Sequence, residues 1–335
     1  MRKSQGRCMM RVGFIGIGSM GQSIAQNVAT AGHELTVYDI DANRATAFAR
    51  RQGCRSTINL ADIASNEFVV TMLPTGPIVR QVLLEAQDGA FQKALSPGTI
   101  AIDMTSSEPF GTRELGAILA RSGVALLDAP VSKRVVAFSG SAPGNSNATT
   151  GRALVIMLGG DDSGALARAR PLVEDMGDTV CETGPLGSGH MTKALNNFVA
   201  AAAYASACEA MIIGKHFGLD AAKTVGIFNQ STGQSFAAEI MLKNKVAVDD
   251  YQTGFALASM AKDVRIAERL AESRGLNAPM VQLVDSLWDS ALQRLGGTVD
   301  LTAALDSWEQ DLKPVSEPHR EQFLGESAGV RPWPV

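Results

Sequence analysis

Two regions with different hydrophobic patterns follow one another along the chain. From residue 11 to about residue 184, short apolar runs rich in β-branched residues alternate with longer amphipathic stretches. The predicted strands are Val12–Ile17, Leu35–Asp39, Phe68–Met72, Thr99–Asp103, Ala125–Asp128, Leu154–Leu158 and Thr179–Cys181. The predicted helices between them are Met20–Ala31, Asn43–Arg51, Glu108–Arg121 and Ser163–Met176. Near-continuous apolar strands separated by helices predict a doubly wound α/β domain, with a mostly parallel sheet covered on both faces.

After Gly187 the strand pattern stops and helical periods continue alone. A long helix is predicted over Met191–Phe217, where small residues lie on most sides and allow other helices to pack closely. The further predicted helices are Ala221–Asn229, Phe236–Val246, Ala256–Arg274, Pro279–Leu295 and Leu301–Leu312. We therefore expect an α/β domain over residues 11–186 and an all-α domain over residues 187–313, joined by the long helix.

Two stretches interrupt these patterns. Residues 139–151 are rich in Gly, Ser, Asn and Pro, a composition that predicts a loop. The tail over residues 314–335 contains four prolines and no helical period, which predicts an extended arm or a disordered segment.

Composition narrows the class of protein. The 335 residues are 45% hydrophobic and 19% charged, which suits two domains with sizeable cores. The net charge of −4 gives no basic field for nucleic acid. Four cysteines lie far apart and form no metal-spaced pair, so we expect reduced thiols, a cytoplasmic location and no metal site. The apolar stretch Phe198–Gly214 is mostly alanine and contains Glu209, so a buried helix is favoured over a membrane span.

A glycine-rich loop follows the first predicted strand. It reads Gly16-Ile17-Gly18-Ser19-Met20-Gly21, a GxGxxG motif placed between a strand and a helix. In a dinucleotide site the first glycine permits the tight turn, the second lets the backbone approach the pyrophosphate, and the third lets the helix pack closely. The helix start then offers unpaired N–H groups and a positive dipole end to the phosphates. The motif in this context predicts a dinucleotide-binding loop.

Asp39 ends the second predicted strand, 18 residues after Gly21. An acidic residue near this position accepts the ribose hydroxyls of NAD and repels the 2′-phosphate of NADP. We therefore expect NAD rather than NADP, although Arg44 could compensate a 2′-phosphate.

Polar and turn-forming residues follow the third and fourth predicted strands. Met72-Leu73-Pro74 ends one of them, and Asp103-Met104-Thr105-Ser106-Ser107 ends the other. Ligands of open α/β sheets bind at the carboxyl ends of strands, so these segments are candidates to line the cofactor site. Ordinary strand-to-helix turns, with Thr105 or Ser107 as a helix cap, are the alternative.

Several ordered motifs together resemble the β-hydroxyacid dehydrogenase family, which includes 3-hydroxyisobutyrate dehydrogenase and tartronate semialdehyde reductase. The motifs span most of the chain; they are the segments Gly13–Gly21, Thr71–Pro74, Asp103–Ser106, Asp128–Ser132, Gly187–Gly189, Lys193–Asn197 and Lys262–Asp263. The resemblance implies a Rossmann-like domain related to that of 6-phosphogluconate dehydrogenase, a helical second domain, and a substrate cleft between them. It also implies hydride transfer between nicotinamide and the hydroxyl carbon of a small β-hydroxyacid, with subunits paired as a homodimer or homotetramer. By the same resemblance the catalytic lysine falls on Lys193, and Lys262 reaches the cofactor.

The residue spacing around Lys193 is compatible with that role. Lys193 and Asn197 are four residues apart on the predicted long helix and therefore share a face, with Asn196 beside them. A lysine among apolar neighbours is suited to take the hydroxyl proton during oxidation and return it during reduction. The amides of Asn196 and Asn197 could hold substrate oxygens.

The sequence departs from the family after Ser132, where the family usually has two glycines that help to bind the substrate carboxylate. Here Lys133 and Arg134 follow, and then the long loop to Gly151. Two cations could bind a second anionic group, so we expect a polar or sugar-derived acid as substrate. Alternatively, both side chains face solvent and only the loop backbone contacts substrate.

Several alternatives stay open. His190, next to the predicted long helix, could relay protons, but a capping or packing role is favoured. Asp263 is best interpreted as a helix-face ion pair with Lys262. An imine reductase shares the expected fold but typically lacks the lysine. A catalytically silent dinucleotide-binding scaffold is disfavoured by the presence of Lys193, Asn196 and Asn197 together.

Overall fold

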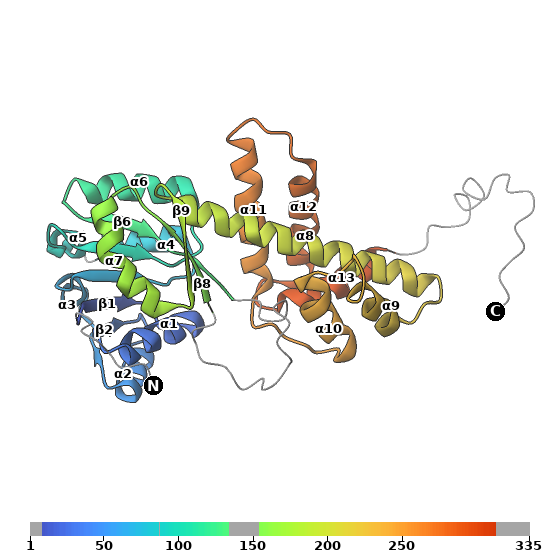
Figure 1. The fold of residues 1–335 in the computed structure, drawn as a ribbon, viewed down its shortest axis with the longest axis horizontal. Coiled ribbons are helices and arrows are strands. Elements are labelled where there is room, and N and C mark those ends of the chain that lie inside the picture. Colours follow the sequence, from blue (N-terminus) through green and yellow to red (C-terminus); the bar gives the residue numbers. More distant parts are fainter. Residues whose placement is uncertain (1–8, 87, 134–153, 313–335) are drawn as a thin grey trace, which may run out of the picture. The chain divides into compact units, whose positions relative to one another are not determined.

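The computed structural model describes residues 9–86, 88–133 and 154–312. They form two compact units (Figure 1). The first unit contains the chain up to Phe198 together with Asp263–Asn277, and the second contains Val199–Lys262 and residues 278–312. Arg134, the predicted loop at 139–151 and the predicted arm at 314–335 lie outside the described residues. The domain boundary expected after residue 186 stays a prediction.

A sheet of nine strands forms the centre of the first unit. Its order is β3-β2-β1-β4-β5-β6-β8-β7, and β9 pairs with β8. The strands are β1 (Arg11–Ile15), β2 (Glu34–Tyr38), β3 (Arg55–Ser56), β4 (Phe68–Thr71), β5 (Ile100–Asp103), β6 (Ala125–Asp128), β7 (Val131–Lys133), β8 (Leu154–Gly159) and β9 (Thr179–Gly184). The strands from β3 to β6 pair in parallel, with Ile15 of β1 opposite Tyr38 on one side and Thr71 on the other. The predicted doubly wound, mostly parallel sheet is confirmed.

Helices cover both faces of this sheet (Figure 1). The helices α1 (Ser19–Thr30), α2 (Ala42–Gln52) and α7 (Ser163–Met176) pack on one face. The other face carries α3 (Leu60–Ala64), α4 (Gly76–Arg80) with a π-helical turn over Gln81–Glu85, α5 (Ala90–Ala94) and α6 (Pro109–Ala120). Successive residues of β1 point to opposite faces, so Phe14 belongs to the first core and Ile15 to the second. Because both faces are buried, the strands have no polar alternation.

Beyond β6 the sheet contains antiparallel pairs, which the sequence pattern did not predict, together with the parallel pair β8–β9. β8 runs against both β6 and β7, and it meets β6 at the single residue pair Asp128–Gly159. Pro130 separates β6 from β7, because proline has no N–H to donate to a strand ladder. The strands β3 and β7 and the helices α3, α4 and α5 were not predicted, since two to five residues are too few to show a period.

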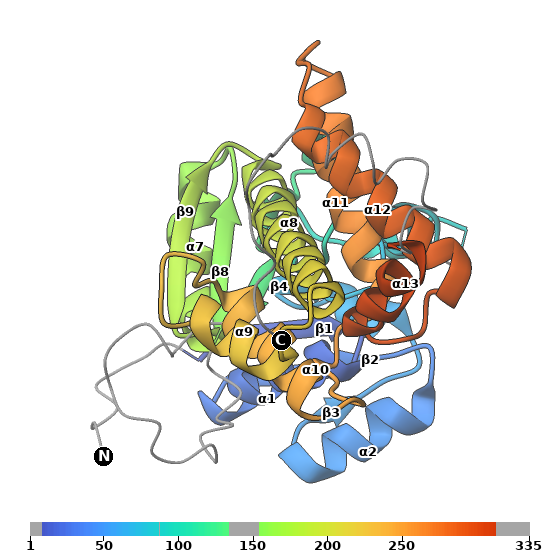
Figure 2. The same ribbon diagram turned by 90° about the vertical axis from the view of Figure 1, so that its right-hand side faces the viewer.

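The second unit is helical, as expected. The long helix α8 (Ser188–His216) begins in the first unit and continues into the second as one unbroken helix (Figure 2). The other helices are α9 (Ala221–Phe228), a π-helical turn over Ala237–Leu242 leading into α10 (Lys243–Ala247), α11 (Leu257–Glu272), α12 (Pro279–Leu295), a 3-10 turn over Leu301–Ala303, and α13 (Ala304–Asp311). Tyr204, Trp288 and Trp308 form its aromatic core, with ring centroids 5.3 to 6.2 Å apart.

Hydrogen bonds to the carboxylate of Asp300 link the turn before α11 to the turn before α13. Its carboxylate accepts hydrogen bonds from the backbone N–H of Gly254 (2.8 Å) and from the hydroxyls of Thr253 and Thr302 (both 2.9 Å). Burial raises the pKa of Asp300, but the hydrogen bonds from Thr302, Thr253 and Gly254 outweigh it and lower the pKa below its ordinary 3.8. The ionised carboxylate is therefore the form that stabilises this corner.

Among the described helices, α8 is long and apolar enough to cross a membrane. Core helices of soluble proteins meet the same criterion. The first turns of α8 contain Lys193 and Asn197, both of which are buried and hydrogen-bonded to each other. The composition of α8 therefore does not by itself indicate a membrane span.

Candidate active site

The glycine-rich loop connects β1 to α1 in the geometry that the motif predicts. Gly16 has a φ of +99°, and a Cβ there would lie 2.2 Å from the carbonyl oxygen of Met72. A Cβ on Gly21 would lie 1.9 Å from the carbonyl oxygen of Gly16. Gly18, by contrast, has open space around it and begins α1 without a side-chain cap. The first N–H groups of α1, at Ser19 and Met20, are therefore left for a ligand.

Asp39 holds this loop from the end of β2. Its Oδ2 accepts the N–H of Ile17 at 2.7 Å, and its Oδ1 accepts the N–H of Asp41 and the guanidinium of Arg44 at 2.9 and 3.2 Å. Arg44 also lies 3.5 Å from the carboxylate of Asp41. The positive charge of Arg44 is thus balanced by two carboxylates. Ile17, whose N–H binds Asp39, buries its side chain in the core of the sheet.

The segments after β4 and β5 are tied together by Asp103. Its Oδ1 accepts from the hydroxyl of Thr71 at 2.9 Å and from the N–H of Thr105 at 3.0 Å. Its Oδ2 accepts from the hydroxyl of Ser107 at 2.9 Å. The hydroxyl of Thr105 in turn accepts the N–H of Leu73 at 3.0 Å. Thr105 and Ser107 therefore bind the neighbouring strand ends and do not cap α6, whose first residue is preceded by Glu108 without a side-chain cap.

The remaining predicted residues of these segments lie beside that network. Met72 and Leu73 are half-buried, Pro74 is exposed and Ser106 is half-buried. The carboxyl ends of β1, β4 and β5 thus carry the predicted cofactor residues side by side, since these strands are neighbours in the sheet.

Lys193 on α8 begins a chain of three buried side chains. Its Nζ donates to Oδ1 of Asn197 at 3.1 Å, and Nδ2 of Asn197 donates to Oδ2 of Asp263 at 2.6 Å. All three are less than a tenth exposed. Nδ2 of the exposed Asn196 also donates to Oδ1 of Asn197 at 3.1 Å. The carboxylate therefore fixes the amide orientation of Asn197, so that its oxygen faces the lysine.

The structure adds contacts for two residues whose roles were left open by the sequence. Asp263 is only 1% exposed and accepts a hydrogen bond from Asn197, a contact that the sequence did not predict; its ion pair with Lys262 stays a prediction. His190 is buried, and its Nδ1 lies 2.8 Å from the hydroxyl of Thr112, which agrees with a packing role. Sequence reasoning did not predict the partners of Asp103, Asp128 or Asp263; the signal available was an acidic residue at a strand end or within an apolar helix face.

The segment expected to recognise substrate is described in part. Ser132 is half-buried in β7, opposite Val155. The backbone of Lys133 belongs to β7, but its side chain and Arg134 lie outside what the structure describes. Lys262 is half-buried on α11 and belongs to the second unit.

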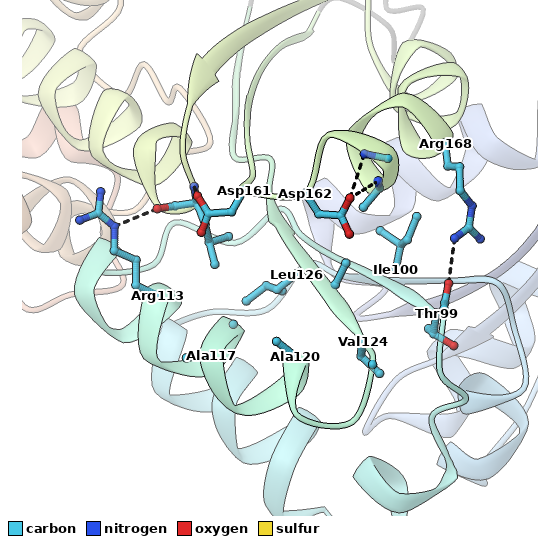
Figure 3. Close-up of a pocket in the computed structure, with 17 residues that line it drawn as sticks. Thr99, Ile100, Arg113, Ala117, Ala120, Val124, Leu126, Asp161, Asp162 and Arg168 are labelled. Carbon is cyan, nitrogen blue, oxygen red and sulfur yellow. Dashed lines mark hydrogen bonds between the residues drawn. The ribbon is translucent and has the colours of Figure 1, made fainter.

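A pocket of about 530 Å³ lies elsewhere in the first unit, between α6 and α7 (Figure 3). It forms because β6 and β8 share only one residue pair and because α6 presents Gly116, Ala117 and Ala120. Arg113 and Arg168 at its two ends donate to the carbonyls of Leu186 and Gly98. None of the predicted site residues lines this pocket. Within the described ranges, no three His, Cys, Asp or Glu side chains are arranged to hold a metal ion.

Comparison with known proteins decides the family. The family model for the NAD binding domain of 6-phosphogluconate dehydrogenase matches residues 11–184. The model for the NAD-binding domain of NADP-dependent 3-hydroxyisobutyrate dehydrogenase matches residues 187–308. The chain belongs to the 3-hydroxyisobutyrate dehydrogenase family.

Individual relatives agree with this family. The NAD-dependent L-serine dehydrogenase of Pseudomonas aeruginosa is 32% identical over 297 residues, 85% of this chain and 93% of the relative. The 2-(hydroxymethyl)glutarate dehydrogenase of Eubacterium barkeri is 27% identical over 303 residues, 90% of this chain and 95% of the relative. A solved structure of Mycobacterium tuberculosis 3-hydroxyisobutyrate dehydrogenase with L-serine has a TM-score of 0.76 and 26% identity, covering 90% of this chain and 99% of that one.

The resemblance inferred from the motifs is confirmed, and with it the class of enzyme. This member of the 3-hydroxyisobutyrate dehydrogenase family is an NAD-binding oxidoreductase that acts on the CH–OH group of a hydroxyacid.

Proposed function

We propose that this enzyme reversibly oxidises a small, polar β-hydroxyacid with NAD and that Lys193 transfers the proton. The buried chain from Lys193 through Asn197 to Asp263 carries the proposal. A solvated surface lysine would be exposed, whereas Lys193 is buried and hydrogen-bonded to a buried amide. A substrate cleft between the domains stays a prediction.

The residues of the glycine-rich loop fit a dinucleotide. The uncapped start of α1 and the open space at Gly18 leave room and N–H donors for a pyrophosphate. When bound, NAD supplies the nicotinamide ring that accepts the hydride. The segments Met72–Pro74 and Ser106 would line the nicotinamide side of the site. Lys262 stays a proposed cofactor residue, on the resemblance alone.

Lys193 and Asn197 have different proposed roles at the reacting hydroxyl: Lys193 transfers the proton, and Asn197 orients Lys193. The neutral amine of Lys193 would take the hydroxyl proton during oxidation, and the ammonium would return it during reduction. Asn197 holds Nζ by its amide oxygen at 3.1 Å, so the lysine stays in one orientation in both protonation states. Asn196 and Ser132 would hold substrate oxygens.

The choice of NAD over NADP rests on Asp39. A 2′-phosphate placed near this carboxylate would be repelled by it. Arg44, the residue that could offset the repulsion, is already paired with Asp39 and Asp41. NAD, with its two ribose hydroxyls, meets an acceptor instead.

The proposed substrate is more polar or more highly charged than 3-hydroxyisobutyrate. Lys133 and Arg134 stand where the family usually has glycines, beside Ser132. A methyl-bearing substrate makes no use of two extra cations, whereas hydroxyls or a second carboxylate can accept their hydrogen bonds. One relative is named 2-(hydroxymethyl)glutarate dehydrogenase, and 2-(hydroxymethyl)glutarate is a dicarboxylate. Substrates with a second anionic group therefore occur among its relatives.

A panel of hydroxyacids tests the proposal directly. The purified protein is assayed for NAD and NADP reduction with 3-hydroxyisobutyrate, serine, a sugar acid and a hydroxylated dicarboxylate. We expect hydroxyacid-dependent reduction of NAD, fastest with a polar acid. Absence of turnover with every acid and both cofactors would contradict the proposed function.

Subunit assembly belongs to the same proposal. The second unit exposes Ile213, Phe217, Leu219 and Ile227 near the junction of α8 and α9, and Phe217 is 84% exposed. Exposed apolar side chains of this kind are typical of an interface, so we propose a homodimer or homotetramer. The cytoplasmic location proposed with it rests on the widely spaced cysteines. A monomeric mass by light scattering at micromolar protein would refute this assembly.

A further inference from the structure

Asp128, at the end of β6, is the least exposed carboxylate beside the candidate site, with no accessible surface. Both of its oxygens are used by the start of α8. Oδ1 accepts the N–H of Gly187 at 2.8 Å, and Oδ2 accepts the N–H of His190 at 2.8 Å. These are N–H groups that a helix leaves without partners inside itself. Asp128 therefore caps α8 from a different element, 59 and 62 residues away in the chain.

The glycines that precede Lys193 make this contact possible. Gly187 has a φ of +87°, a conformation that favours glycine. A Cβ on Gly189 would lie 2.2 Å from the carbonyl oxygen of Met157 and 2.8 Å from Oδ2 of Asp128. A Cβ on Gly159 would lie 2.5 Å from Oδ1 of the same carboxylate. Gly159 and Gly189 thus clear the space in which the helix start rests directly on Asp128, and Gly187 permits the turn that precedes it.

A second set of contacts holds the same turn of α8. The imidazole of His190 lies between two buried carboxylates, with Nε2 3.7 Å from Asp103 and Nδ1 3.9 Å from Asp128. Nδ1 is also 2.8 Å from the hydroxyl of Thr112 on α6. The contact with Thr112 therefore holds this turn against α6, whereas Nε2 makes no hydrogen bond within the described residues and only lies near Asp103, which binds the ends of β4 and β5.

Resting on the proposed function of Lys193, we propose that Asp128 is a positioning residue that sets the place of Lys193 relative to the cofactor loops. Lys193 follows His190 by three residues, less than one helical turn, so a shift of the capped N–H groups moves Nζ with them. The buried negative charge also faces the positive end of the dipole of a 29-residue helix, which makes the contact strong and directional. Asp128 touches neither substrate nor cofactor in this proposal.

Asp128→Asn tests the proposal, because asparagine keeps the size but offers a single acceptor oxygen. Its NH₂ group would face an N–H of α8, and the two donors would push the helix start away. We expect kcat to fall about 10–100-fold, the scale on which a misplacement of about 1 Å acts. The Kd for NAD, measured by titration, stays within about twofold, since the loop at Gly18 is not touched.

Asp175→Asn is the matched control. Asp175 is also a buried carboxylate of the first unit, where it lies 3.2 Å from His33 on the side of α7 and α1. Both variants should lower Tm by about 5–10 °C, the effect of losing one buried charge-assisted contact. With the assay run well below both Tm values, only Asp128→Asn should lose kcat.

Thr112→Val provides a second route if Asp128→Asn does not fold. It removes the hydroxyl that holds His190 and should lower kcat about 3–10-fold, by a smaller shift of the same turn. Equal kcat for wild type and for every folded variant of this set would overturn the positioning role. A kcat loss of the same size in Asp175→Asn would also overturn it, because general destabilisation would then explain the effect. An inactive wild type would instead contradict the proposed function.

Discussion

Replacing Asp263 tests how Lys193, the proposed proton-transfer residue, is held. The carboxylate accepts from Asn197 at 2.6 Å in a site that is 1% exposed, so the bond is short, buried and charge-assisted. Asp263→Ala leaves the amide of Asn197 free to turn its NH₂ group toward Lys193. Asp263→Asn keeps an acceptor but loses the charge.

The structure predicts a graded loss of kcat. A charge-assisted bond contributes about 1.5–3 kcal/mol and a neutral one about 0.5–1.5 kcal/mol. If the difference falls on the transition state, Asp263→Asn should lower kcat roughly 5–15-fold and Asp263→Ala roughly 10–150-fold. The assay is initial-rate NAD reduction at saturating hydroxyacid, with the Kd for NAD measured by titration and Asp175→Asn as the control for lost buried charge.

Three results would refute this reasoning. The first is an alanine variant within twofold of wild type, which would mean that the orientation of Asn197 does not matter. The second is an asparagine variant that loses more activity than the alanine variant. The third is a loss of kcat that follows a weaker Kd for NAD, which would place Asp263 in cofactor binding instead.

Three further predictions concern the cofactor, the substrate and stability. Asp39→Asn should lower the ratio of kcat/KM for NAD to kcat/KM for NADP. A wild-type enzyme that turns over NADP better than NAD would show that Asp39 is wrongly interpreted. Replacing Lys133 and Arg134 by glycine should lower kcat/KM for the polar acid roughly 10–150-fold, because charge-assisted contacts are lost, and should raise kcat/KM for 3-hydroxyisobutyrate. Unchanged kcat/KM values for both acids would mean that the two cations face solvent. Because the pKa of Asp300 is lowered in the folded protein, its stabilising effect is complete above the ordinary pKa of 3.8 and is lost as pH falls toward the folded value. Tm should therefore fall more steeply below about pH 4 in wild type than in Asp300→Asn, and parallel Tm curves would contradict this.

Local patterns predicted much of the fold. The bounds of α7 and α12 agree with the predicted helices, because fourteen and seventeen residues show a helical period clearly. The glycine loop was predictable because each glycine acts on residues of the same loop or the adjoining strand. The antiparallel β8 was not, since strand direction depends on its partner and not on its own composition.

The candidate site shows the same division. Lys193 and Asn197 are four residues apart, so helical geometry alone puts them on one face. Asp263 is 66 residues from Asn197, and Asp128 is 59 residues from Gly187. Such contacts are made by packing, so the local sequence can mark the acidic residue but does not indicate its partner.

The most direct test of the central claim is the turnover of Lys193→Ala. If Lys193 transfers the proton, kcat should fall at least about 100-fold, the usual scale for loss of a general acid or base, while the Kd for NAD stays nearly unchanged. Both quantities are measured on the same folded preparation, with the hydroxyacid that wild type oxidises fastest. A variant that keeps more than about a tenth of wild-type kcat would contradict the catalytic role of Lys193.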